Sequence, residues 1–198
     1  KLVTGVQTCA LPISGIPAGD LTALTTAILS GKVDLGRLGE LFGLGGYFGA
    51  YVPGMDQTLF PKGTAKRLKA RDTLILQMHY TPNGKLTRDR TQIGFYFSKT
   101  KPERYLKTVA AYTTQFTIPP RTNDFPVSAT TKPLAKAMWL YELSPHMHYR
   151  GSRMRFEAVY PDGRSELLAN VPAYQFDWQT LYRLTTPVLL PEIGRAHV

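Results

Sequence analysis

The sequence predicts an all-β protein made of two antiparallel β-sandwiches. Glycine and proline account for 17 and 15 of the 198 residues, and aromatic residues make up 11%. From about residue 58, short apolar runs rich in β-branched residues alternate with turn signals, and no helical pattern separates them. This pattern is typical of sandwiches. A hydrophobic content of 43% with 19% charged residues indicates a globular chain.

A short helical insertion is expected near the N-terminus, over residues 20–42. Residues 20–30 (DLTALTTAILS) have Asp20 as a candidate N-cap and are followed by Gly31, a common C-terminal stop. A second short helix is predicted at 34–42.

Strands are predicted in both halves of the remaining chain. Residues 73–80 (TLILQMHY) form a buried strand, and the turn 81–84 (TPNG) leads to a return strand at 90–98. The polar segment 99–105 contains Pro102 and is the predicted domain boundary. Further strands are expected at 109–118, 127–131 and 137–143, in a hairpin of 153–160 and 164–171 around the Pro-Asp-Gly turn 161–163, and in the alternating stretch 174–184.

Both ends of the chain resemble the translation of a common sequencing adaptor. Residues 1–14 and 192–198 are therefore predicted to be artefacts, and Cys9 is not interpreted as a nucleophile or a ligand. The remaining residues, 15–191, contain no cysteine and only three histidines. The chain is expected to be a fragment of a longer protein.

His146 and His148 form an H-x-H pair that is the leading candidate for a metal site. Residues i and i+2 of a strand point to one face, so both imidazoles can approach one ion. The preceding Ser144-Pro145 step indicates an interruption of strand pairing, which leaves an open rim. Hydrogen bonding of both rings on a solvated face is the alternative. His79 is predicted to point away from the apolar face of its strand.

Several motifs, in order, resemble the copper type II, ascorbate-dependent monooxygenases, the family of peptidylglycine α-hydroxylating and dopamine β-monooxygenases. The similarity is greatest to bacterial members and spans most of residues 47–191. The motifs are LQMHYTPNGK (76–85), IGFYF (93–97), SPHMHYRG (144–151), YPDGR (160–164) and VPAYQFDWQTLYRL (171–184).

The resemblance implies two jelly-roll-like β-sandwiches that each hold one copper ion. Residues 15–101 would be the C-terminal part of the first domain and residues 105–191 the N-terminal part of the second. His79 would bind the electron-transfer copper, and His146 and His148 the oxygen-binding copper. The other three ligands would lie outside this chain, so the fragment alone is expected to be inactive.

The implied reaction is hydroxylation of a C–H bond with O₂ and electrons from ascorbate. The substrate is an organic molecule whose identity is open. Peptide-processing relatives have an arginine two positions before the H-x-H pair, where this chain has Ser144, and this argues against a peptidylglycine substrate. The family further implies a periplasmic or secreted location. Neither a membrane span nor nucleic-acid binding is expected: no apolar run approaches the roughly 20 residues of a membrane helix, and the charge of +10 is scattered apart from residues 62–71.

Two alternatives remain open at this point. The three histidines would form a zinc site for hydrolysis or structure if they converged on one ion. Alternatively, the chain is a non-catalytic β-sandwich that binds carbohydrate or protein, with Trp139, Trp178 and Tyr182 as platform residues.

Overall fold

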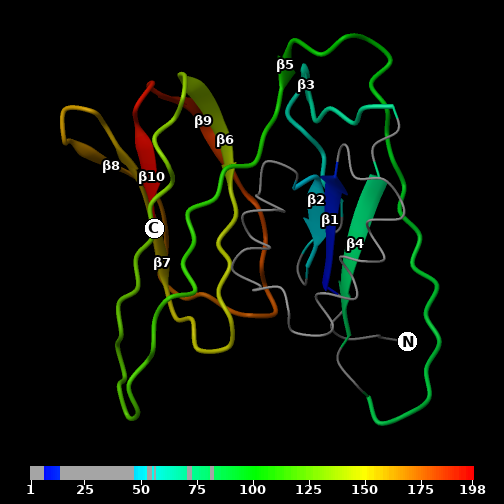
Figure 1. The fold of residues 1–198 in the computed structure, drawn as a ribbon, viewed down its shortest axis with the longest axis horizontal. Helices are drawn as coiled ribbons and strands as arrows, with labels where there is room; N and C mark the ends of the chain where they lie inside the picture. Colours follow the sequence, from blue (N-terminus) through cyan, green and yellow to red (C-terminus); the bar gives the residue numbers. More distant parts are fainter. Residues whose placement is uncertain (1–6, 14–46, 53–54, 56, 71–72, 81–82) are drawn as a thin grey trace. The chain divides into compact units, whose positions relative to one another are not determined.

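The computed structural model describes residues 7–13, 47–52, 55, 57–70, 73–80 and 83–198 (Figure 1). Within these ranges the chain forms small sheets, mostly antiparallel, and no helix. The all-β prediction is therefore confirmed, whereas the helical insertion predicted at 20–42 lies outside the described residues. None of the described residues belong to a helix that could cross a membrane. The chain divides into two compact units, Lys1–Thr108 and Val109–Val198.

The described residues of the first unit form one three-stranded sheet and one short pair of strands. The sheet has the antiparallel order β2 (Gly49–Tyr51), β1 (Gln7–Ile13), β4 (Thr73–His79), and β3 (Thr64–Ala65) pairs in parallel with β5 (Arg104–Tyr105). β4 confirms a strand in the predicted range 73–80, but Leu76 and Tyr80 are exposed, so the predicted burial is not confirmed there. Because β5 pairs with β3, the start of the segment that the sequence assigns to the second domain belongs to the first unit.

The side chain of Lys66 ties distant segments of the first unit together. Its Nζ donates hydrogen bonds to the carbonyl oxygens of Tyr47 (3.2 Å) and Phe48 (2.9 Å) and to Oγ1 of Thr108 (2.8 Å). The same ammonium group lies 5.2 Å from the ring centre of Tyr47. This lysine of the basic stretch 62–71 therefore has a structural role.

Both chain ends that resemble adaptor sequence contain strands. β1 lies between β2 and β4, with Gln7 opposite His79 and Ile13 opposite Thr73. β10 (Arg195–His197) pairs with β7 (Met154–Val159). Strand pairing reports on the conformation of these residues and not on their origin, which stays a prediction.

The return strand predicted at 90–98 is absent. The Tyr80 hydroxyl donates to Oδ2 of Asp89 (2.9 Å), and the Thr91 hydroxyl donates to the same oxygen (2.6 Å), so side-chain contacts and not a strand ladder join these residues. Phe95 packs against Phe48, with ring centres 5.9 Å apart. An alternating pattern predicts a strand only where a partner edge is within reach.

The second unit holds two antiparallel sheets. One has the order β10, β7, β8 (Ser165–Val171), and the other pairs β6 (Met138–Leu143) with β9 (Tyr182–Leu190). The strands predicted at 137–143, 153–160 and 164–171 are confirmed. Residues 109–118, in contrast, form no strand, and of 127–131 only the end hydrogen-bonds to residues 196–198.

The predicted Pro-Asp-Gly turn connects β7 and β8. Gly163 has a φ of 86°, a conformation that glycine adopts readily and other residues disfavour. Arg164 donates from its side-chain Nε (2.7 Å) and its backbone N–H (3.0 Å) to the carboxylate of Asp162. These bonds lower the pKa of Asp162.

Side chains from both sheets meet in one core. Ala158 of β7 is 1% exposed and clusters with Leu134 and with Leu190 of β9. Partly buried side chains around this cluster come from β6, β8, β9 and the residue after β7: Met138, Leu140, Tyr160, Leu168 and Val188. At the other end of β6, Nε and Nη2 of Arg183 both bind Oε1 of Glu142 (2.9 and 2.6 Å). This cross-strand pair holds β6 and β9 together next to their last ladder position.

We predict that the Gly163→Ala variant is less stable than the native chain by about 1–2 kcal/mol, because alanine is strained at positive φ. Gly163→Asn is the matched control and should lose less, since asparagine tolerates this region. Urea unfolding of both variants measures the difference. Equal stability of Gly163→Ala and the native chain would contradict the strain argument, because a Cβ at this position meets no atom within 4 Å.

Candidate metal centre

His146 and His148 lie immediately after β6, at the open end of the β6–β9 pair. The last ladder position joins Leu143 to Tyr182, and Pro145, which has no N–H to donate, is fully buried just beyond it. The histidines therefore follow the strand and are not part of it, so strand alternation does not place them. Both side chains are exposed.

The two imidazoles are nevertheless close together. Their ring centres are 5.4 Å apart and their planes are inclined by 84°. Two imidazoles that bind one ion at about 2.0 Å through nitrogen have ring centres about 5 Å apart. The spacing of the pair thus fits a shared ion.

Gln179 fixes the proton position on the His146 ring. The Gln179 amide nitrogen donates to the carbonyl oxygen of Phe176 (2.7 Å), so its Oε1 is the acceptor in the 2.6 Å bond to Nδ1 of His146. Nδ1 therefore carries the proton in the neutral ring. Nε2 keeps its lone pair, as a metal-ligating histidine requires.

Burial of Gln179 makes this arrangement rigid. The side chain is only 2% exposed, and both of its polar atoms are hydrogen-bonded. Breaking either bond would leave a buried polar group without a partner, which is costly. The orientation of the His146 ring is therefore set by Gln179, while the His146 residue as a whole is exposed.

Tyr174 holds the backbone between the two histidines. Its hydroxyl donates to the carbonyl oxygen of Met147 (2.6 Å) and accepts from the Met147 N–H (3.0 Å). The Tyr174 side chain is buried, and burial raises the pKa of its hydroxyl. One side chain thus satisfies both backbone polar groups of Met147, a residue that lies beyond the end of β6.

A tight turn closes the histidine segment. The Gly151 N–H donates to the carbonyl oxygen of His148 (2.8 Å), and Ser152 accepts from the Tyr174 N–H (2.8 Å). A Cβ on Gly151 would overlap Cβ of Met147 and lie 2.9 Å from its sulfur. The absence of a side chain at Gly151 allows Met147 to pack here.

The ring of Phe176 makes aromatic contacts with the histidine segment. The Tyr149 ring stacks on it at 4.4 Å, and the His148 ring meets it edge-on at 6.4 Å. Residues 146–152 are therefore supported along their length by residues 174–179.

His79, the third predicted ligand, ends β4 in the first unit. Its side chain is exposed, as are those of Leu76 and Tyr80. The hydroxyl of Tyr80, the next residue in the chain, bonds to Asp89. The assignment of His79 as a ligand stays a prediction. No group of three His, Cys, Asp or Glu side chains arranged for a metal occurs among the residues that the structure describes.

Sequence analysis missed the two residues that support the His pair. Gln179 and Tyr174 lie 33 and 27 residues from their partners, and both reach them through side-chain contacts that follow no strand period. The only signal was their position within 171–184, a motif of the family resemblance.

We predict that neutral His146 in solution is the Nδ1–H tautomer. Long-range ¹H–¹⁵N spectra of the ring nitrogens, recorded at about pH 8 where free imidazole is neutral, should show an unprotonated Nε2. Gln179→Leu removes the acceptor and should return the ring to a tautomer mixture, with a stability loss of about 1–3 kcal/mol. His148 in the same spectra is the internal control. A mixture at His146 in the native chain would contradict the assignment.

No family model, curated protein or solved structure matches this chain.

Proposed function

We propose that this chain is part of a copper-dependent monooxygenase that hydroxylates a C–H bond, with His146 and His148 as ligands of the oxygen-binding copper. The observation that carries the proposal is the hydrogen bond from Nδ1 of His146 to buried Gln179. It leaves the lone pair on Nε2, and a second imidazole lies at a distance that suits one shared ion.

The donor set agrees with copper. Imidazole binds copper in both oxidation states, and a site with two histidines needs at least one more donor to be complete. By the family resemblance that donor is a methionine, and His79 belongs to the separate electron-transfer copper. The finer fold assignment, two jelly-roll-like sandwiches, and a periplasmic or secreted location belong to the same proposal.

Bound copper would supply O₂ activation and one-electron chemistry, with ascorbate as the reductant. The chain itself orients the ligands. Gln179 fixes one ring and its proton, Tyr174 fixes the backbone between the rings, and Phe176 flanks His148. Because both histidines are exposed, a third ligand and a substrate could reach them from solvent.

We expect the chain to bind Cu(II) weakly but specifically at the His pair. Calorimetric titration and the nitrogen couplings in the electron paramagnetic resonance spectrum measure this. The double variant His146→Ala/His148→Ala should lose the site, because both nitrogen donors are gone. His197→Ala is the matched control. Nδ1 of His197 is hydrogen-bonded to Thr130, so we expect no contribution of His197 to copper binding at the His pair.

The same titration discriminates between one metal site and two. If His79 belongs to a different site, His79→Ala leaves the nitrogen couplings from His146 and His148 unchanged. Loss of one shared site in both His79→Ala and the double variant would support a three-histidine zinc-type centre instead. Undiminished copper binding by the double variant would refute the proposal.

A further inference from the structure

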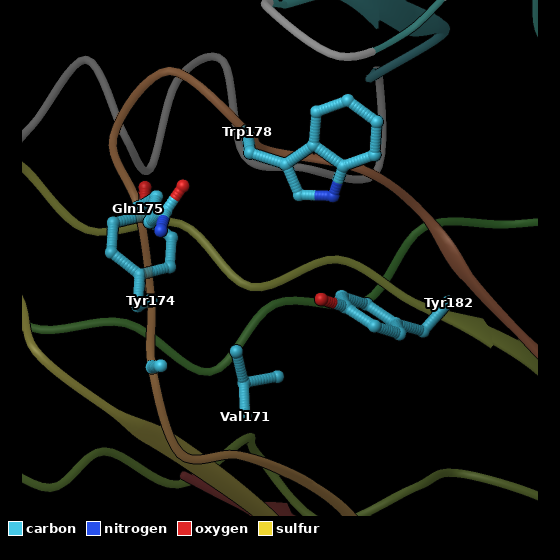
Figure 2. Close-up of a pocket in the computed structure, with 6 residues that line it drawn as sticks. Val171, Tyr174, Gln175, Trp178 and Tyr182 are labelled. Atoms are coloured by element: carbon cyan, nitrogen blue, oxygen red, sulfur yellow. The ribbon is translucent and has the colours of Figure 1, made fainter.

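A cavity of about 290 Å³ lies beside the segment that supports the histidines. Six residues line it, all between the end of β8 and the start of β9: Val171, Ala173, Tyr174, Gln175, Trp178 and Tyr182. Figure 2 shows Trp178 and Tyr182 on one side of this group and Tyr174 and Gln175 on the other, with the Tyr182 hydroxyl pointing inward. The volume is close to the lower end of the range for small-molecule sites.

The lining leaves large apolar rings in water. Trp178 is 59% exposed and Tyr182 is 37% exposed. Contact with the aromatic ring of a ligand would remove the exposed apolar area of these side chains from water, which is favourable. The Tyr hydroxyl and the Trp indole N–H can hydrogen-bond to a substituent on the ligand. An apolar cavity roughly half this size holds one benzene. The space here therefore suits one substituted ring.

The lining also carries no charge. None of the six side chains is ionised near neutral pH, so a charged ligand would lose hydration without gaining an ion pair. The amide of Gln175, the indole N–H of Trp178 and the hydroxyl of Tyr182 are polar groups of this lining. This favours a neutral ligand with one hydrogen-bonding substituent.

The ring arrangement favours an aromatic ligand over a sugar. Trp178 is seen nearly face-on in Figure 2 while Tyr182 is tilted, so the two do not form a flat platform. Trp139, the third expected platform residue, lies on β6 opposite Leu189 and does not line the cavity. Tilted rings around a compact space suit edge-to-face contact with an aromatic ring.

We propose that this cavity is a binding site for a neutral aromatic small molecule. The site stands on the cavity alone and does not require copper. Tyr174 links it to the His pair, because the Tyr174 ring lines the cavity while its hydroxyl holds Met147.

The test uses the fluorescence of Trp178 in the metal-free chain. The chain has two tryptophans, so the Trp139→Phe variant makes Trp178 the only one. Benzyl alcohol should bind saturably and shift its emission to the blue, because the ligand covers an exposed indole. Benzoate should bind at least about tenfold more weakly, since its charge has no partner. Methyl glucoside represents the sugar alternative and should cause no saturable shift.

Two variants locate the site. Tyr182→Ala should weaken benzyl alcohol binding about tenfold through loss of ring contact, whereas Tyr112→Ala, at an exposed tyrosine of the second unit outside the cavity, should not. In Trp178→Phe the remaining Trp139 should report no shift. Equal binding of benzoate and benzyl alcohol, tighter binding of methyl glucoside, or an unchanged affinity in Tyr182→Ala would each overturn the proposal.

Discussion

The arrangement of the histidine pair depends on one buried amide. Gln179 is almost completely enclosed, and its two polar atoms bind two different partners, a backbone carbonyl and an imidazole nitrogen. The carbonyl can only accept, which determines which end of the amide faces the imidazole and therefore where the ring proton lies. An exposed glutamine would exchange partners with water. Burial is what converts a common hydrogen bond into a fixed tautomer.

The position of the site follows from the end of a strand pair. β6 and β9 stop pairing at Leu143 and Tyr182, and the buried Pro145 prevents the ladder from continuing in its usual form. Beyond this point side chains replace the ladder, because Gln179 and Tyr174 reach across to the opposite segment. Two exposed imidazoles can lie here because the backbone groups beside them already have partners.

The strands with local signals were predictable from the sequence, and the contacts that build the site were not. The hairpin of β7 and β8 follows from alternation on both sides of Pro161, Asp162 and Gly163, and β4 follows from its apolar run. Residues 90–98 show that an alternating pattern alone does not predict a strand, because the strand with which they would pair is not determined by local sequence. The proximity of His146 and His148 was expected, but from strand geometry that the segment does not have. The contacts of Tyr174 and Gln179 join residues far apart in the chain, and no periodic pattern in a single sequence indicates such contacts.

One short segment serves both features of the second unit. Trp178 and Gln179 are neighbours in the chain, yet one side chain lines the cavity and the other is buried against His146. Tyr174 takes part in both, with its ring at the cavity and its hydroxyl at Met147. A ligand bound in the cavity would therefore contact the same segment, residues 174–179, that orients the imidazoles. Because interiors are closely packed and yield little, a displacement of this segment would be transmitted to the histidine pair instead of being absorbed locally.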